Sequence, residues 1–328
     1  MLEEYHRISK NEKLARFKVI KKISVDIEGN ETLSKLWEIH ENALKKLKTG
    51  RTDEEVKFSL LDLKILIAEK LFRSCCFCER RCKVDRTKET GFCGVKEPRV
   101  ASEFMHIGEE QPLIPSHTIF FSGCTFRCVF CQNWDISQFP EAGVVISPKK
   151  LAKIIDRKRQ LGSKNVNFVG GDPTPNLNYI LKVMKYCREN IPVIWNSNMY
   201  LTVESMKLLD GFVDLYLTDF KFGNDDCAKK LANVDNYWEV ITRNHLLAEK
   251  SGDVIIRHLV LPGHVECCTE PIIEWIAENM EKAVVNIMGQ YRPVYKANKY
   301  PEIARYPTSE EIYKARKLAE KEGLELLP

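Results

Sequence analysis

The sequence has no long uninterrupted apolar run and no apolar segment near its start. Its longest apolar stretch, Phe58–Ile67, contains charged residues and is too short to cross a bilayer. The first residues, Met1-Leu-Glu-Glu-Tyr-His6, are charged and lack the apolar centre of a signal peptide. These absences predict a cytoplasmic protein without a membrane partner.

A strong charge of one sign is also lacking. The formal net charge is +4 over 328 residues, which does not suggest a nucleic-acid partner and argues only weakly for anionic ligands. Beyond an alternation of strands and helices, we find no internal repeat and no low-complexity tract. Twelve cysteines could indicate disulfides, but here they form two tight clusters plus scattered singles. Without a signal peptide, that pattern favours metal ligation in a reducing compartment.

The most informative cluster is Cys124, Cys128 and Cys131, with the spacing C-x3-C-x2-C. It supplies three thiolates, one fewer than the four that a cubane iron–sulfur cluster needs, so one iron would stay open to a small molecule. An apolar strand precedes the loop and Gly123 makes the turn, which places the ligands at the carboxyl end of a strand. The alternative is a zinc knuckle that lacks its fourth ligand.

The segment Cys124-x-x-Arg127-Cys128-x-x-Cys131-x-Asn133 resembles the signature of the radical S-adenosylmethionine (SAM) enzymes. More narrowly, it resembles the activating enzymes of glycyl radical enzymes, such as pyruvate formate-lyase-activating enzyme. The resemblance covers about residues 115–328 and implies a radical SAM oxidoreductase of the activating type. In that family the cysteines hold a 4Fe–4S cluster whose fourth iron binds SAM. One electron, expected from a flavodoxin- or ferredoxin-type donor, cleaves SAM to methionine and a hydrogen-abstracting 5'-deoxyadenosyl radical.

The same region alternates between strands and helices, which predicts an α/β fold with a parallel sheet. Strands are expected over 118–122, 165–170, 192–196, 213–219, 253–261 and 284–289. Helices are expected near 148–160, 175–190, 202–210, 225–233, 236–250, 267–281 and 308–322. Six such units are too few for an eight-fold barrel, and the resemblance implies an open, partial (β/α)6 barrel.

The preceding sequence divides into two parts. Residues 1–74 read as a helical extension, with one helix capped near Thr32 and ending at Gly50, and a second beginning near Thr52. We expect a helical hairpin packed on the core of residues 115–328. Residues 75–114 are rich in cysteine and arginine and poor in apolar residues, which predicts a segment that needs a metal to hold its shape.

The second core strand ends in Gly170-Gly171-Asp172. Paired glycines let a ligand approach the backbone closely, and a carboxylate accepts hydrogen bonds from an ammonium group. The motif resembles the family's GGE, which implies that Asp172 holds the amino group of SAM with a side chain one methylene shorter. The alternative is a turn in which Asp172 acts as a cap.

Polar residues follow the later strands as well. The resemblance places Asn198 near SAM or substrate, with local turn capping as the alternative. It implies that Asp219 hydrogen-bonds the ribose or methionine end of SAM and that Lys221 pairs with the methionine carboxylate, against the alternative of an ion pair. The resemblance also implies that Arg257 is a site residue, because the activating enzymes share the R-x-x-x-x-P-G layout that begins at Arg257 in the fifth strand. Tyr291 replaces a family histidine, and we predict that its ring stacks on adenine.

The upstream cysteines Cys75 (or Cys76), Cys78, Cys82 and Cys93 suffice for a closed site, as zinc or a second 4Fe–4S cluster. Four further cysteines are expected to be isolated thiols: Cys187, Cys227, Cys267 and Cys268.

The sequence leaves the substrate open. One hypothesis is a protein loop in which a glycine becomes a glycyl radical, and a groove open to a peptide would favour it. The rival is a small anionic metabolite or cofactor precursor, favoured by a cavity closed by residues 1–74 and the upstream cysteine segment, 75–114. A third hypothesis is a metal-binding or electron-transfer protein without enzymatic activity.

Overall fold

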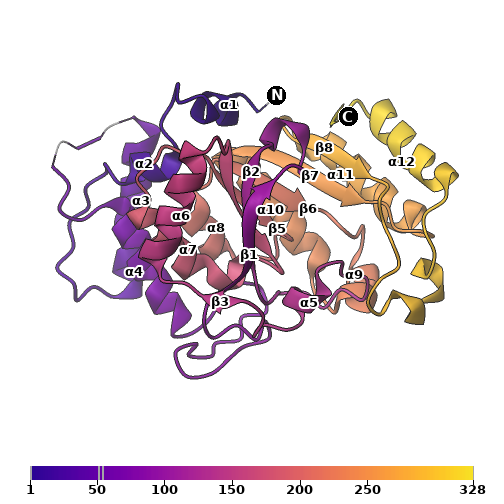
Figure 1. Cartoon of the computed structure of the whole chain (residues 1–328), viewed down its shortest axis with the longest axis horizontal. Coiled ribbons are helices and arrows are strands. Elements are labelled where there is room, and N and C mark those ends of the chain that lie inside the picture. Colours follow the sequence, from indigo (N-terminus) through magenta and orange to yellow (C-terminus); the bar gives the residue numbers. More distant parts are fainter. Residues whose placement is uncertain (1, 51, 54, 328) are drawn as a thin grey trace.

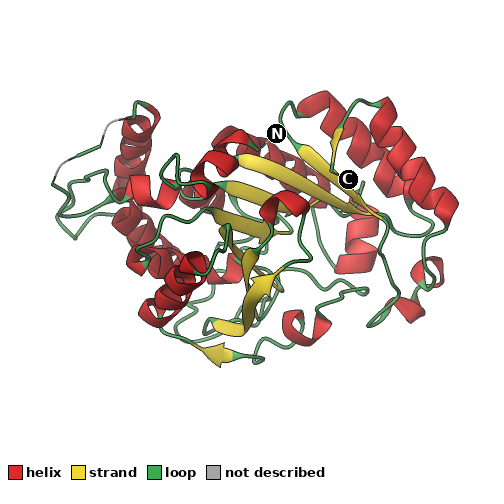
Figure 2. Cartoon of the chain, turned by 45° about the horizontal axis from the view of Figure 1, so that its top comes forward, coloured by secondary structure: helices red, strands yellow, loops and turns green. Residues whose placement is uncertain are grey.

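One continuous nine-stranded sheet runs through the molecule, in the order β3-β1-β2-β4-β5-β6-β7-β8-β9. The structure, a computed structural model, describes residues 2–50, 52, 53 and 55–327. Figure 1 shows the sheet curving through the centre of the molecule with helices on its outer side, and Figure 2 shows the strands fanning out as the sheet twists.

Seven consecutive strands of this sheet are parallel, and all except the last, β9, are the six that the sequence predicts. Those six are β2 (Ser116–Phe121), β4 (Asn165–Gly170), β5 (Val193–Ser197), β6 (Leu215–Asp219), β7 (Asp253–Leu259) and β8 (Val284–Met288). On its other edge β2 pairs with β1 (Arg99–His106), while β8 pairs with β9 (Glu325–Leu326). Within the described residues the sheet therefore does not close on itself, and the fold is an open, partial barrel.

The sequence analysis missed three short or edge strands. β1 runs antiparallel to β2 and also pairs with β3 (Val144–Val145). Only Val100 of β1 is fully buried and most of its other residues are half-buried, so β1 lacks the clear alternation of a strand with one covered face. β9 has two residues, too few for any sequence pattern to reveal.

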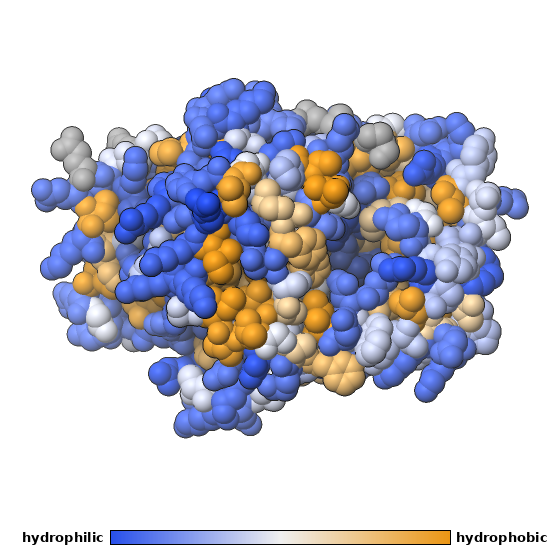
Figure 3. All heavy atoms as spheres, viewed as in Figure 1, coloured by the Kyte–Doolittle hydropathy of each residue, from blue (hydrophilic) through white to orange (hydrophobic). Residues whose placement is uncertain are grey.

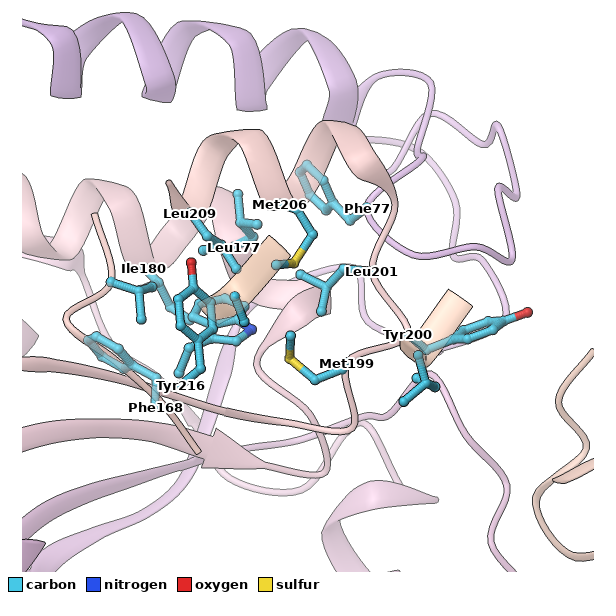
Figure 4. Packing of buried hydrophobic residues seen from close by; sticks show 14 of the residues in the cluster. Phe77, Phe168, Leu177, Ile180, Met199, Tyr200, Leu201, Met206, Leu209 and Tyr216 are labelled. Atoms are coloured by element: carbon cyan, nitrogen blue, oxygen red, sulfur yellow. The ribbon is translucent and has the colours of Figure 1, made fainter. Parts of the chain in front are cut away.

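Helices cover the outer face of the parallel strands. They are α6 (Pro148–Gln160), α7 (Leu177–Tyr186), α8 (Val203–Leu209), α9 (Asp225–Ala232), α10 (Tyr237–Ser251), α11 (Glu270–Asn279) and α12 (Ser309–Lys321), with the short α5 (Trp134–Ser137) after the cysteine loop. A π-helical turn, Val265–Thr269, leads into α11. Figure 4 shows the packing between layers, with Leu177 of α7 and Leu209 of α8 near Phe168 and Tyr216 of the sheet.

The amino-terminal region contains α1 (Glu3–Ser9), α2 (Arg16–Ile20), α3 (Leu33–Lys48) and α4 (Leu60–Phe72). α3 and α4 form the predicted hairpin, and α4 packs against α7 (Figure 1). The predicted start of the second helix near Thr52 is wrong, because Ser59 and Asp62 form a capping box that starts α4 at Leu60. Asp53 instead accepts a hydrogen bond from the backbone N–H of Ser24.

α1 closes the barrel at the end where the parallel strands begin. The ring of Tyr5 is fully buried in an apolar cluster with Leu215 and Val284, the first residues of β6 and β8. Its backbone N–H donates to Asp253 Oδ2 over 2.8 Å, and its hydroxyl accepts from Asn165 Nδ2 over 2.8 Å. In the described part of the chain, the interior of the barrel is therefore packed at this end.

Apolar side chains are exposed around β1 and β3. Phe104, Ile107, Val144 and Val145 are each between 39% and 78% exposed. Figure 3 shows apolar residues gathered on this face, beside a hollow in the surface. Among the described residues, no helix combines the length and apolar character needed to cross a membrane.

Candidate active site

The loop after β2 brings three cysteines to the carboxyl end of the barrel. Gly123 begins it with φ +85°, and a Cβ there would lie 2.2 Å from the Val95 side chain. The backbone N–H groups of Arg127 and Val129 donate over 2.9 Å to the carbonyls of Ala232 and Leu231, at the end of α9. The loop is thus held from outside by an adjacent helix.

The three cysteines open onto a cavity of about 290 Å³ that is lined by the ends of the parallel strands. Of the site residues predicted from the sequence, ten line it: Cys124, Cys128, Cys131, Gly170, Gly171, Asp172, Asn198, Asp219, Lys221 and Arg257. Residues separated by more than 130 positions in the chain therefore converge on one space. Asn196, Ser197 and Gln290 line the cavity too.

Burial raises the pKa of all three thiols, that of Cys128 to about 12. Polar groups approach two of the sulfurs: Asn198 Nδ2 lies 3.8 Å from Cys124 Sγ, and Ser137 Oγ lies 3.2 Å from Cys131 Sγ. In the described part of the chain, the three sulfurs are not all within 4.8 Å of one another. Thiolates on a single tetrahedral zinc would be about 3.8 Å apart. The set fits a larger iron–sulfur cluster better than one zinc ion.

The paired glycines are required by the fold as well as by any ligand. A Cβ on Gly170 would lie 2.1 Å from the backbone of Phe121, and one on Gly171 would lie 2.2 Å from the carbonyl oxygen of Gly123. The backbone N–H groups of Gly171 and Asp172 donate to Phe121 and Gly123 over 2.8 and 3.0 Å. The end of β4 is therefore pressed against the start of the cysteine loop.

The carboxylate of Asp172 is buried and already has three donors. Oδ1 accepts from the Thr174 backbone N–H over 2.9 Å, and Oδ2 accepts from Ser197 Oγ and the Asn198 backbone N–H over 3.0 Å each. Burial raises its pKa in spite of these bonds. The carboxylate therefore organises the turn after β5, and one of its roughly four acceptor positions stays available to a ligand.

Asp219, Lys221 and Arg257 form a buried charge network on the cavity wall. Lys221 Nζ lies 2.8 Å from Asp219 Oδ2, and Arg257 Nη2 lies 3.0 Å from Asp219 Oδ1. Burial raises the pKa of Asp219, but the two cations outweigh it and hold that pKa below its usual value. Arg257 also donates to Asn196 Oδ1 over 2.6 Å. All three side chains are therefore charged, and they can pair with charged groups of a ligand in the cavity.

Tyr291 is not placed as the sequence analysis predicts. Its ring is 1% exposed and packs edge-on against Phe130, and its hydroxyl donates to the Ile303 carbonyl over 2.7 Å. The strand ends at Met288, so Tyr291 lies beyond the strand alternation and turns into the core, while Gln290 faces the cavity. Stacking of Tyr291 on adenine is therefore ruled out by its position.

A second cavity of about 230 Å³ adjoins the first and shares Arg257, Met288 and Gln290 with it. Its other wall is the segment after β1, where Glu109 accepts from Asn167 of β4 and Glu110 accepts from Asn286 of β8. Glu110 Oε2 is buried and has no hydrogen-bond partner among the described residues. The sequence analysis missed this acidic pair. Two adjacent carboxylates after a half-buried strand were the available signal.

The upstream cysteines gather around a small pocket behind the cysteine loop. Cys75, Cys78, Cys82 and Cys93 line it, and Cys76 does not. Burial raises the pKa of Cys78 well above its usual range, and the three other thiols raise it further. The two cysteine regions touch, since the guanidinium groups of Arg80 and Arg127 lie 3.9 and 4.4 Å from the ring centre of Phe92.

Comparisons with known proteins agree with this geometry. A sequence model of the Radical SAM superfamily matches residues 118–276. An uncharacterized protein of Methanocaldococcus jannaschii is 55% identical over 336 residues, covering 99% of both chains. Pyruvate formate-lyase 1-activating enzyme of Escherichia coli strain K12 is 27% identical over 153 residues, covering 44% of this chain and 60% of the enzyme.

Among solved structures, the crystal structure of methylornithine synthase aligns with 99% of this chain and 78% of its own. The identity is 12% and the TM-score is 0.48, a similarity that carries no argument about substrate.

Proposed function

Because the chain belongs to the radical SAM superfamily, we propose that Cys124, Cys128 and Cys131 hold a 4Fe–4S cluster and that SAM binds in the cavity beside it. Such a cluster, once reduced by an external donor, would pass one electron to SAM, giving methionine and a 5'-deoxyadenosyl radical that would abstract a hydrogen atom from the substrate. The observation that carries the proposal is the convergence of the cysteines and the charged strand ends on one cavity.

The other residues of the cavity would position SAM. Asp172 offers its remaining acceptor position to the amino group of SAM. That position is close to Cys124, because Asp172 binds the backbone of Asn198, whose amide lies beside Cys124 Sγ. Lys221, charged and 2.8 Å from Asp219, offers donors to the methionine carboxylate. A flavodoxin- or ferredoxin-type protein would supply the electron.

For the upstream cysteines we propose a second 4Fe–4S cluster instead of zinc. A zinc ion would hold its thiolates about 3.8 Å apart. Within the described residues, no three of the sulfurs of Cys75, Cys78, Cys82 and Cys93 lie within 4.8 Å of one another. A cluster binds each cysteine through a different iron and so accommodates wider spacing.

The second cavity is the proposed place of a small substrate. It shares Arg257 with the SAM cavity, and its wall carries Glu109 and the unpartnered oxygen of Glu110. A buried carboxylate oxygen without a partner favours a ligand that donates hydrogen bonds, such as an amine. The expected anionic metabolite therefore gives way to a small molecule with a cationic or donor group. Residues 108–111 form this wall, and they belong to the upstream segment 75–114 that the sequence analysis named, together with residues 1–74, as a closure for a small substrate.

A second candidate is glycyl radical formation in a partner protein. The similarity to pyruvate formate-lyase 1-activating enzyme favours it, although that similarity covers 44% of this chain. In this case a peptide loop of the partner would have to reach the cavity from the carboxyl end of the barrel.

The test is anaerobic reconstitution with iron and sulfide, followed by SAM, dithionite and chromatographic detection of 5'-deoxyadenosine. Cys128→Ala should lose the product and part of the iron, Cys78→Ala should lose iron from the other site, and Cys187→Ala should lose neither. Product formation by Cys128→Ala would contradict the proposal. Stimulation by the dialysable fraction of a cell extract would favour the small substrate, and stimulation by the protein fraction would favour a glycyl loop.

A further inference from the structure

Cys227, His264 and Cys267 come together on the outside of the barrel, away from both cysteine sites. Cys227 lies on α9, whereas His264 and Cys267 lie in the turn that leads into α11. Their ligand atoms are all within 4.8 Å of one another, and the two sulfurs are 3.8 Å apart. The prediction of isolated thiols is therefore wrong for Cys227 and Cys267. The signal in the sequence was the H-x-x-C pair formed by His264 and Cys267.

The imidazole of His264 is oriented by the backbone. Its Nδ1 lies 3.0 Å from the carbonyl oxygen of Pro262, so Nδ1 carries the hydrogen and donates it. Nε2 is then left with its lone pair for a ligand. Histidines that bind metals commonly donate their other ring N–H to a backbone carbonyl in this way. The residue is 7% exposed, so the orientation is fixed by packing as well.

The distances suit one ion of small radius. Zinc–sulfur bonds of about 2.3 Å in a tetrahedron put two thiolates about 3.8 Å apart, which is the separation of these two sulfurs. We propose that Cys227, His264 and Cys267 bind a single thiophilic divalent cation of the zinc class. The Sγ of Cys268 lies 3.9 Å from that of Cys267 but outside the group of three, so the fourth position of the tetrahedron is left to another ligand, such as water.

The site joins two loops that leave the cavity wall. Asn224 follows β6 and caps α9, accepting at its Oδ1 from the Cys227 N–H, and its Nδ2 donates to the Cys267 carbonyl over 2.7 Å. Gly223 packs so closely on the same turn that a Cβ would lie 2.7 Å from the Cys267 carbonyl oxygen. A bound ion would therefore lock the loop after Asp219 to the loop after β7. α9 would be fixed as well, and its last carbonyls hold the cysteine loop.

This proposal does not depend on the function proposed above, and metal counting tests it directly. The full chain is reconstituted anaerobically with iron and sulfide, exposed to excess Zn²⁺, desalted and analysed for both metals. The wild type should retain one zinc per chain that Cys227→Ser and Cys267→Ser lose, with equal iron in all three. Cys187→Ser, which removes a buried thiol bonded to Asp156, should retain the zinc. Equal zinc in the wild type and both serine variants would overturn the proposal.

A second measurement needs no substitution. Cys267 is exposed, so iodoacetamide should alkylate it in the zinc-free protein, and zinc should slow that reaction roughly tenfold or more. Peptide mass spectrometry locates the modified residue, and a chelator should restore the rate. An alkylation rate unaffected by zinc, or a Cys227–Cys267 disulfide that forms equally fast with zinc present, would show that the pair does not bind the cation.

Discussion

Single side chains around the cysteine loop do more than contact a ligand. Asp172 fixes the backbone of Asn198, and the amide of Asn198 in turn reaches Cys124 Sγ and Thr125 Oγ1. A donor to a cluster sulfur stabilises the more negative, reduced state and so raises the reduction potential. The turn role and the ligand role that the sequence offered as alternatives for Asp172 are therefore compatible.

Asn198→Ala should keep the cluster but make its reduction potential more negative, because one hydrogen bond to Cys124 is lost. A redox titration followed by electron paramagnetic resonance measures the shift. Asn196→Ala is the matched control, since Asn196 also lines the cavity but bonds to Arg257. Equal potentials in the Asn198→Ala protein and the wild type would show that the 3.8 Å contact has no electrostatic effect.

Asp172→Asn should weaken SAM binding roughly tenfold while iron content is unchanged, because a neutral amide loses the charge-assisted bond to the amino group. Equilibrium binding to the reconstituted protein without reductant measures the affinity. Unchanged affinity would leave Asp172 with only its part in the turn.

At the residue level, the sequence predicted which residue types meet at the cavity but not how each is oriented. Cys124, Asp172 and Lys221 follow strands directly, and parallel strands bring their carboxyl ends together. Tyr291 also lies three residues beyond the end of its strand, β8, so its distance from the strand does not by itself fix its direction. The apolar contact with Phe130 decides its orientation there, and sequence spacing does not encode that contact.

Among the elements, the junction between β4 and the cysteine loop is the tightest. Gly171→Ala would place a Cβ 2.2 Å from the Gly123 carbonyl oxygen, and relief requires the backbone to move. We expect a loss of about 1–3 kcal/mol in the free energy of unfolding and poorer iron retention. Urea denaturation and iron analysis check both. Gly108→Ala meets only the His106 side chain, at 3.3 Å, and should be nearly neutral.

β7 is tied to α11 by a neutral histidine. His258 Nδ1 donates to the Phe220 carbonyl, Nε2 accepts from Thr269, each over 2.8 Å, and burial lowers its pKa from 6.5 to about 4. Between those values the unfolded chain binds the proton and the folded chain does not, so stability falls as pH falls. The contribution is about 3 kcal/mol over the whole window. Unfolding of His258→Gln should show a weaker pH dependence than the wild type between pH 6.5 and 4. Identical slopes would contradict this.

The elements with strong periodicity were predictable, and those shaped by tertiary contacts were not. β5 and β6 begin with apolar residues on both faces because both faces are covered, so their patterns are plain. The start of α4 depends on which residues cap the helix, and the capping box of Ser59 and Asp62 sets it at Leu60. β1 is half exposed at the edge of the parallel strands, so its pattern is weak. The cysteines before it indicated a segment held by a metal and not a strand.

For the whole molecule, the decisive feature is the closure of the barrel by α1. Tyr5→Ala should lower the free energy of unfolding by about 3–5 kcal/mol, because a fully buried ring leaves a cavity among the strand beginnings. Tyr5→Phe loses only the bond from Asn165 and should cost about 1 kcal/mol. Urea denaturation of the two variants separates packing from hydrogen bonding, and equal losses would contradict this division.

The walls of the two cavities could not be deduced from the sequence. Glu110 reaches Asn286 across 176 residues, and no local pattern joins them. Cys227 on α9 and Cys267 in the turn before α11 are 40 residues apart, so their spacing resembles no ligand motif. Such groupings become visible only when the strand order is known.

The bond between Tyr5 and Asp253 spans 248 residues of the chain. During synthesis α1 leaves the ribosome long before the strands against which it packs. Its apolar face stays exposed until those strands are made. Closing so long a loop late in folding costs entropy and slows the final step. In a nascent chain stalled before β7, the end of the barrel and the apolar face of α1 would therefore both be exposed to solvent. This is the stage of synthesis at which a chaperone would matter most.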